Sequence, residues 1–495
     1  MLENAVQSID WFAIAPTLIL ACTAIVVLLA DAFLGPPRTW ARALVPTTLT
    51  LAGIAAAAVP AALMRGDVRA TFCVTSPVEG PASCSYVVDS FTLVFWAIVL
   101  FGTAVVTLLG TAAIVDGRTP QGEWNFLLLC SATGALAIAA SRDLITLVVS
   151  LEVVSLPAFA LVGLRSGDAK SAEASVKFFL VSVISTAVML MGVSLVYGVT
   201  GSVFLDQING ALASGASPRT VAVAGTLLTI VGLAFKVAAV PFHMWVPDTY
   251  VGAPVAIAAY LSVVSKAAGF VGLMLVLSFG LQEFVDVWAP LMGVLAALTM
   301  TVGNVLALWQ QHAIRLLAWS SVAQAGYILV PFGAAASTDA LGPALGYLAI
   351  YTFVNLGAFA VATVVGTRYP RQRLSDYRGL IREEPGAGWA LAFALVALAG
   401  LPPGIVGLFA KVIVFDSAAG TVTWLAVVMA VNVAIGLVYY ARWLMELFRP
   451  AEVAAGSTYD VPNGVGIAIG MTFGAGVLFS VFPGLLLDPV MAVLG

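Results

Sequence analysis

Long runs of apolar residues, separated by short polar segments, extend along the whole chain. Most runs reach the roughly 20 residues that an α-helix needs to cross the hydrocarbon core of a bilayer. Membrane β-strands would instead alternate apolar and polar residues over about ten positions, and these runs do not alternate. The pattern therefore predicts an all-α polytopic membrane protein with about 14 transmembrane helices.

The predicted helices lie near residues 12–34, 41–63, 88–115, 124–140, 143–164, 172–199, 221–246, 252–279, 285–309, 313–333, 340–367, 387–416, 421–447 and 463–487. The longest polar connections are residues 64–87, 200–220 and 368–386, and none is long enough for a soluble domain. We therefore expect a single membrane domain over residues 1–495.

The composition agrees with this class, because 61% of the residues are hydrophobic and only 9% are charged. Soluble proteins carry about 25% charged residues. The net charge of −4 and the lack of a basic tail give no indication of nucleic-acid binding. The first residues, "MLENAVQSID", are acidic, so we expect the first apolar run to be retained as a helix and not cleaved as a signal peptide.

The distribution of basic residues between alternate loops predicts the orientation, since cytoplasmic loops are rich in Lys and Arg. One side holds thirteen: Arg38, Arg42, Arg118, Arg165, Lys170, Arg315, Arg368, Arg371, Arg373, Arg378, Arg382, Arg442 and Arg449. The other side holds four: Arg65, Arg69, Arg142 and Arg219. This excess predicts that both termini lie on the outer side.

The four remaining basic residues are all lysines within predicted helices: Lys177, Lys236, Lys266 and Lys411. The sixteen arginines avoid the helix centres. Arginine stays protonated, whereas a desolvated lysine can release its proton. A fixed countercharge could be either residue, but a proton carrier must be titratable, so this bias favours proton transfer.

Lys236 and Lys266 lie too deep in their helices to reach the membrane surface easily, and an unpaired charge there costs roughly 3 kcal/mol or more. Glu152 is the acid nearest the middle of a span, and it is the natural partner for a buried lysine. The alternative is a static salt bridge that locks two helices together. We favour function, because ionisable groups within membranes usually serve it.

Three further candidates are less central. Lys177 lies near the inner end of its helix, so reaching to the membrane surface explains it as well as function does. Lys411 lies toward the outer half of its segment, and we favour function there. His243 follows Lys236 by two helical turns and is a relay candidate. His312, at a loop edge, is interpreted as an ordinary interfacial residue.

Prolines interrupt two predicted helices, the seventh at Pro241 and the twelfth at Pro402–Pro403. Each of these helices also carries a buried lysine. Paired interruptions of this kind are typical of inverted repeats with a pathway near the membrane midplane. The expected divisions are three N-terminal helices (1–123), a first repeat of helices four to eight (124–280), a second repeat of helices nine to thirteen (281–450) and a C-terminal helix (451–495).

The four cysteines form no metal-binding pattern. Cys22 and Cys130 lie in apolar runs, where we expect small core residues. Cys73 and Cys84 share one polar loop on the predicted outer face, where disulfides persist, so we predict a disulfide between them; two free thiols are the alternative.

Several segments resemble the antiporter-like subunits of respiratory complex I and of multisubunit cation/proton antiporters. The motifs are "SLEVVSLPAFALVGL" with Glu152, "LAFKVAAVPFHMWVPDTYVGAPVAIAAYLSVVSKAA" with Lys236, His243 and Lys266, "IRLLAWSSVAQAGYILV", and "LSDYRGLIREEPGAGWALAFALVALAGLPPGIVGLFAK" with Lys411. Lys177 fits the lysine of the family's sixth helix. A histidine often stands where this chain has Gln324, which puts proton transfer at that position in doubt.

The resemblance implies a proton-pumping subunit of the bacterial cell membrane that handles no electrons. It implies no cofactor in this chain, with NADH, flavin, iron–sulfur clusters and quinone in partner subunits. The expected partners are another antiporter-like subunit, small membrane subunits and the lipid bilayer, with no nucleic acid. Two alternatives remain open: a subunit of a multisubunit cation/proton antiporter, and a purely structural membrane subunit.

Overall fold

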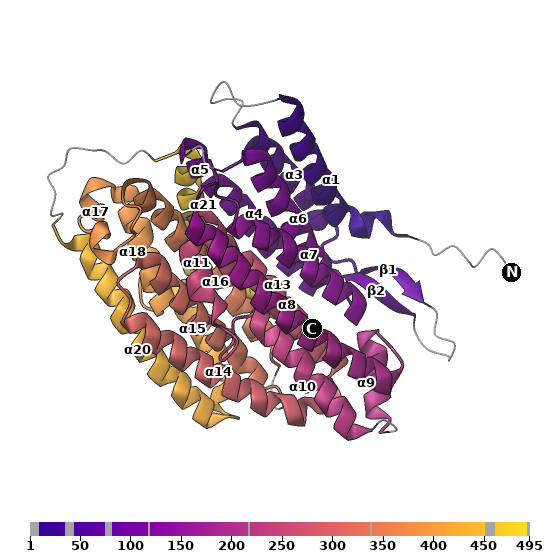
Figure 1. Ribbon diagram of the computed structural model, residues 1–495. Helices are drawn as coiled ribbons and strands as arrows, with labels where there is room; N and C mark the ends of the chain where they lie inside the picture. Colours follow the sequence, from indigo (N-terminus) through magenta and orange to yellow (C-terminus); the bar gives the residue numbers. More distant parts are fainter. Residues whose placement is uncertain are drawn as a thin grey trace.

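The computed structural model describes residues 9–34, 44–74, 82–116, 119–215, 218–336, 339–450 and 461–492. Helices form a single bundle in which most axes run in similar directions (Figure 1). Of the described helical segments, 13 are long and apolar enough to cross a membrane. The predicted all-helical polytopic architecture is therefore confirmed for the bundle.

The helices up to residue 275 are α1 (Trp11–Leu34), α3 (Val45–Leu63), α4 (Ser90–Leu109), α5 (Thr111–Asp116), α6 (Gln121–Ala140), α7 (Leu144–Val162), α8 (Ala169–Thr200), α9 (Leu205–Ala213), α10 (Arg219–Lys236), α11 (Trp245–Gly252), α12 (Val255–Tyr260) and α13 (Lys266–Leu275). The later ones are α14 (Val285–Leu308), α15 (Ala313–Gly333), α16 (Leu341–Arg368), α17 (Leu380–Glu383), α18 (Pro385–Ala399), α19 (Ile405–Ala419), α20 (Thr423–Phe448), α21 (Asn463–Val481) and α22 (Gly484–Met491). Short π- or 3₁₀-helical turns are η1 (Leu261–Ser265), η2 (Val276–Gly280), η3 (Gln282–Phe284) and η4 (Leu374–Tyr377).

Both predicted interruptions are present. Turns over residues 237–244 separate α10 from α11, and residues 400–404 separate α18 from α19. α18 and α19 have 15 residues each, too few to span the bilayer alone at about 1.5 Å per residue. The predicted helix 387–416 is therefore two short helices, which is why the count of long spans is 13 and not about 14.

A β-hairpin, which the sequence analysis did not predict, occupies part of the polar connection 64–87. Strands β1 (Arg69–Val74) and β2 (Ser83–Val88) pair antiparallel, with Cys73 directly opposite Cys84. A disulfide joins these two cysteines. The hairpin is tied to its surroundings by an ion pair between Arg69 and Asp10 at 2.9 Å. Strands this short carry a weak periodic signal, so the sequence pattern predicts only a polar connection here.

We expect the Cys73–Cys84 disulfide to protect both thiols on intact cells. A membrane-impermeant maleimide should label neither cysteine before reduction and both after it. A variant carrying Cys22→Ser and Cys130→Ser restricts the assay to this pair, since these are the free cysteines of the described residues. Full labelling of both without reductant would contradict the prediction.

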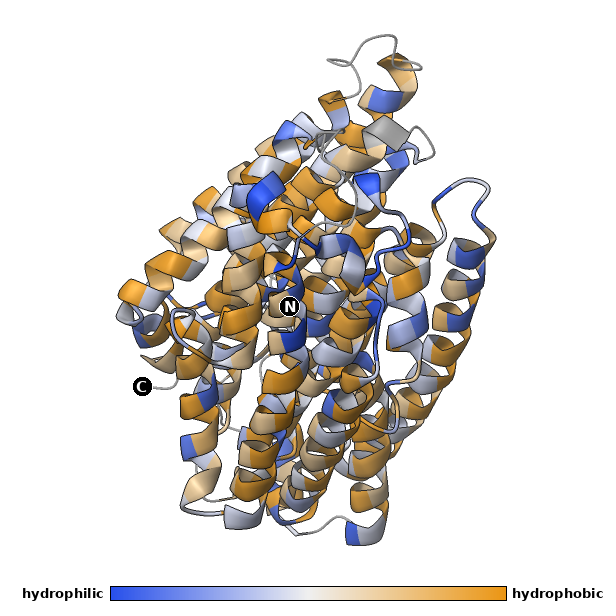
Figure 2. Cartoon of the chain, turned by 90° about the vertical axis from the view of Figure 1, so that its left-hand side faces the viewer, coloured by the Kyte–Doolittle hydropathy of each residue, from blue (hydrophilic) through white to orange (hydrophobic). Residues whose placement is uncertain are grey.

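The core of the bundle lies at α13, α15 and α16, where almost every residue is buried. The outer helices α1, α8 and α21 expose many apolar side chains instead. Figure 2 shows apolar residues along the helices and hydrophilic ones mainly toward their ends and in the connections. This is the distribution that a lipid-facing surface requires.

The two ends of the bundle carry different features (Figure 1). The β1–β2 hairpin and α9 lie at one end, linked by a hydrogen bond from Ser83 Oγ to Asp206 Oδ2 at 2.7 Å. α17 and the C-terminal end of α20 lie at the other end. Arg38, Arg42 and Arg118, which contributed to the predicted orientation, lie outside the described residues.

Candidate functional site

Lys236 ends α10 and points between α7 and α8. Its Nζ donates to Ser155 Oγ at 2.8 Å and to Ser182 Oγ at 3.0 Å, and it lies 3.4 Å from Glu152 Oε1. The lysine side chain is 9% exposed and the Glu152 side chain 26%. The predicted partners are therefore in contact, with the lysine inside the bundle and the carboxylate at its edge.

The Glu152 carboxylate has a second donor. Thr186 Oγ1, on α8, donates to the same Oε1 atom at 2.8 Å. One carboxylate oxygen thus accepts from both a hydroxyl and an ammonium group. The Thr186 hydroxyl group therefore still donates a hydrogen bond to Glu152 if the lysine contact lengthens.

The interruption after Lys236 has its own hydrogen bonds. Ala239 N donates to Ala234 O at 2.8 Å, and Trp245 Nε1 donates to Phe235 O at 3.2 Å. Val240 N donates to Thr299 Oγ1 of α14 at 2.9 Å. These bonds replace those that Pro241 disrupts, so the break is tolerated inside the bundle.

His243 lies in the interruption and is 6% exposed. Its ring lies 5.4 Å from the Trp319 ring of α15. Nδ1 has no hydrogen-bond partner among the described residues. The histidine therefore sits next to the α15 segment that contacts Lys266, on the chain segment that follows Lys236.

Lys266 is buried in the core and 1% exposed. It follows the π-helical turn η1, and its Nζ donates to Ser321 O at 2.7 Å and also to Ser321 Oγ. No carboxylate of the described residues pairs with it. One turn further along α13, the backbone of Lys236 approaches so closely that a Cβ on Gly269 would lie 3.0 Å from it. The helices that carry the two lysines therefore cross at this glycine.

Gln324 continues the polar row one turn after Ser321 on α15. Tyr347 donates to Gln324 Oε1 at 2.5 Å. Gln324 Nε2 donates to Tyr440 OH at 3.0 Å and reaches Leu398 O at 3.4 Å. All of these groups are buried.

Lys411 shares an acceptor with Gln324. Its Nζ donates to Leu398 O at 2.9 Å and to Ala399 O at 2.7 Å, the last carbonyls of α18. The negative end of a helix dipole stabilises a cation there. Gly400 closes α18 with φ +81°, and a Cβ at that position would lie 2.8 Å from Lys411 Cδ, so glycine is needed for both reasons.

Lys177 lies apart from this row. Its side chain is 53% exposed and pairs with Glu173 at 2.7 Å and Asp248 at 3.6 Å. Arg315 pairs with the same Asp248 at 3.0 Å. This surface cluster fits the alternative in which Lys177 reaches to the membrane surface, and its part in proton transfer stays a prediction.

His312 caps α15 at the membrane surface, as an interfacial residue would. Its Nδ1 accepts from Arg315 N at 3.4 Å. Burial and the positive charge of Arg315 lower the pKa of His312, so the ring is neutral near pH 7 and able to accept.

The sequence analysis missed the neutral partners of the lysines, of Glu152 and of Gln324. They are Ser155, Ser182, Thr186, Ser321, Tyr347, Tyr440 and the carbonyls of Leu398 and Ala399. Hydroxyl residues are common in membrane helices, and a backbone carbonyl carries no sequence signal at all. Ser155 and Ser321 lie within the motifs "SLEVVSLPAFALVGL" and "IRLLAWSSVAQAGYILV", but nothing in either motif marks the serine as the partner of a lysine.

The comparisons with known proteins agree with this fold. Residues 141–437 match the family described as NADH:quinone oxidoreductase/Mrp antiporter, transmembrane. This chain thus belongs to the class of antiporter-like membrane subunits.

Two relatives narrow the class. The chain is 53% identical to NADH-quinone oxidoreductase subunit N 2 of Streptomyces griseus subsp. griseus, over 97% of this chain and 93% of the relative. It is 44% identical to NADH-quinone oxidoreductase subunit N of Salinispora tropica, over 92% and 89%. The chain belongs to the family of NADH-quinone oxidoreductase subunit N, the proton-translocating, antiporter-like membrane subunits of complex I.

Solved structures show the same architecture. A chain of respiratory complex I from Thermus thermophilus, with bound aureothin, superposes with a TM-score of 0.77 at 29% identity, covering 96% of this chain and 99% of that one. A chain of the Mrp complex from Dietzia sp. superposes with a TM-score of 0.83 at 20% identity, covering 98% and 97%. The second likeness concerns the fold alone.

Proposed function

We propose that protons cross this subunit along the row Glu152, Lys236, His243, Lys266 and Lys411, coupled to quinone reduction elsewhere in the complex. The observation that carries the proposal is the sequence of buried polar contacts through α7, α10, α13, α15 and α18–α19. Lys236 has a carboxylate beside it, whereas Lys266 and Lys411 have only neutral oxygens. Such unequal compensation gives neighbouring sites different proton affinities, which directional transfer requires.

The redox chemistry belongs to other subunits in this proposal. NADH, flavin, iron–sulfur clusters and quinone would bind there, and this chain would hold no cofactor. Its partners would be another antiporter-like subunit and small membrane subunits within a bacterial cell membrane. The exposed apolar faces of α1, α8 and α21 offer surfaces for lipid or for such subunits.

We further propose that both termini face outward and that residues 124–280 and 281–450 are inverted repeats between the flanking segments 1–123 and 451–495. The disulfide-bearing hairpin and the arginine-rich segment near α17 lie at opposite ends of the bundle, which supports the orientation (Figure 1). The two interrupted helices support the repeats. Lys236 precedes its break and Lys411 follows its own, so the lysines do not occupy equivalent positions.

A stand-alone or multisubunit cation/proton antiporter is the alternative. The Mrp likeness supports it at 20% identity, whereas the 53% identity to a subunit N favours the first reading. Co-purification with a quinone-reducing assembly would distinguish the two.

The proposed role of Lys411, the last group of the row, can be tested by substitution. Lys411→Met removes the ammonium group at the end of the row but keeps an apolar chain of similar length. We expect at least a several-fold loss of proton pumping per quinone reduced in inverted membrane vesicles. Lys170→Met, a lysine exposed on the surface, is the matched control. Normal pumping by an assembled Lys411→Met complex would remove Lys411 from the path.

A further inference from the structure

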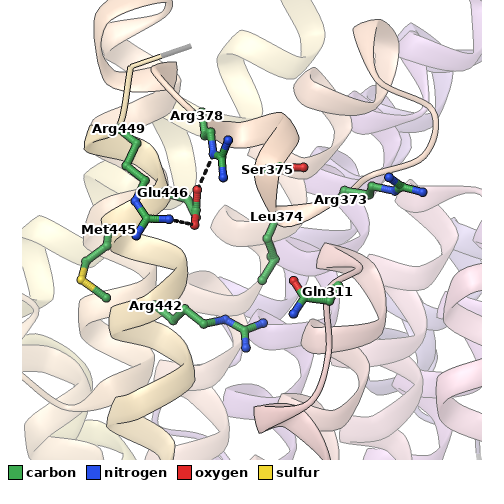
Figure 3. A pocket seen from close by; sticks show the side chains of 9 residues that line it. All are labelled: Gln311, Arg373, Leu374, Ser375, Arg378, Arg442, Met445, Glu446 and Arg449. Atoms are coloured by element: carbon green, nitrogen blue, oxygen red, sulfur yellow. Dashed lines mark hydrogen bonds and ion pairs between the residues drawn. The ribbon is translucent and has the colours of Figure 1, made fainter. Parts of the chain in front are cut away.

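A large cavity opens at the end of the bundle that carries α17 (Figure 3). It has a volume of about 620 Å³ and lies between the C-terminal end of α20 and the segment around η4. Four arginines line it: Arg373, Arg378, Arg442 and Arg449. It takes no part in the row of buried lysines.

The described lining of this cavity holds more arginines than carboxylates. Glu446 is the one carboxylate of the lining and accepts from Arg378 at 2.7 Å and from Arg449 at 2.5 Å. Among the described residues, no carboxylate pairs with Arg373 or Arg442. Among the described residues, four guanidinium groups and one carboxylate thus line the cavity.

Arg442 is held in place by backbone carbonyls. Its Nη1 donates to Leu308 O at 3.0 Å, and its Nη2 donates to Gln310 O, at the C-terminal end of α14. Its charge is thus fixed at the cavity wall without being neutralised by a carboxylate. Figure 3 shows Arg378, Arg442 and Arg449 on one side of Leu374, and Arg373 on its far side with the guanidinium group directed away from the other three.

The cavity lies at the level of the lipid headgroups. Trp309, which is 78% exposed, follows the helix end that binds Arg442. Exposed Trp389 contacts the ring of Phe448 with centroids 6.0 Å apart, and Phe448 precedes Arg449. Exposed Trp residues mark the interface between hydrocarbon and water. Met445, which lines the cavity and is 54% exposed, opens it toward the apolar side.

We propose that this arginine cavity binds the phosphate of an anionic phospholipid headgroup. Guanidinium groups form paired hydrogen bonds with phosphate oxygens, and basic pockets between helices on the cytoplasmic side recognise such lipids. The apolar rim receives the start of the acyl chains, which a soluble phosphate ester lacks. The proposal is independent of the proton path.

The test uses the whole complex in phosphatidylcholine nanodiscs and a photoreactive phosphatidylglycerol. We expect labelling at the C-terminal end of α20 that unlabelled phosphatidylglycerol prevents and phosphatidylcholine does not. Arg373→Gln/Arg449→Gln should require roughly tenfold more lipid for half-maximal labelling. Arg371→Gln/Arg382→Gln removes the same charge from exposed positions that do not line the cavity and should leave labelling unchanged. If the double variant does not assemble, Arg449→Gln and Arg382→Gln give the same comparison singly.

Three outcomes would overturn the proposal. Equal labelling of the cavity variant and its control would show that the arginines do not bind the lipid. Competition by glycerol 3-phosphate as strong as that by phosphatidylglycerol would make a soluble phosphate ester the occupant. A photoreactive amino acid at Met445 that crosslinks to a neighbouring subunit instead of lipid would make the cavity a protein contact.

Discussion

Replacing Lys266 by arginine is expected to abolish proton translocation while the complex still assembles. The lysine is 1% exposed, and its Nζ contacts only Ser321 O and Ser321 Oγ among the described residues. A lysine with only neutral partners can release its proton, whereas an arginine at the same position would keep its charge. We expect pumping to fall to background, measured as the pH gradient formed by inverted vesicles during NADH oxidation.

Two further variants separate this role from packing. Lys266→Met removes the charge and should also abolish pumping, so loss in both variants indicates a need for a titratable group. Lys170→Arg, at an exposed position, should pump normally. A Lys266→Arg complex that assembles and pumps at the wild-type rate would rule out proton storage at this residue.

Glu152→Gln is expected to impair both pumping and the coupled reduction of quinone. An adjacent carboxylate favours the charged form of a buried lysine, and burial alone favours the neutral form. Weakening the 3.4 Å contact would therefore release the proton of Lys236 toward His243 and Lys266. Losing one partner of a buried pair costs roughly 3–5 kcal/mol, or more than a hundredfold in occupancy. The partial exposure of Glu152 places this pair at the low end of that range.

The rival interpretation is a static clamp between α7 and α10. A clamp predicts that Glu152→Gln and Lys236→Met lower the amount of assembled complex, and that the double variant recovers part of it. If the pair instead acts as a gate that controls proton release from Lys236, each variant should assemble normally but show less proton pumping and less quinone reduction. Ser155→Ala, which removes a neutral partner of Lys236 at 2.8 Å, is the matched control and should have a smaller effect. Single variants that assemble and pump normally would eliminate the gate.

The interrupted helices are the feature of the fold that local sequence predicts well. The positions of Pro241 and Pro402–Pro403 predict both breaks correctly, because a proline disrupts the backbone hydrogen bonds of its own helix. The sequence pattern did not predict the hairpin of β1 and β2, because its short strands are stabilised by pairing with each other and not by a local pattern. For Lys177 the sequence left function and a reach to the membrane surface equally open, and its 53% exposed side chain, paired with Glu173, fits the second.

The class of this protein follows from its sequence alone, because the length of a hydrophobic run and the depth of a lysine are properties of single segments that the bilayer selects. What each lysine contacts depends on how the helices pack. Lys236 meets Glu152 and two serines, Lys266 meets Ser321, and Lys411 shares the carbonyl of Leu398 with Gln324. These partners lie on other helices than the lysines, and two of them, Ser321 O and Leu398 O, are backbone oxygens of a kind that every residue has. The compensation of a buried charge depends on atoms within a few ångströms, so the packing of the helices, and not the spacing of residues, sets it.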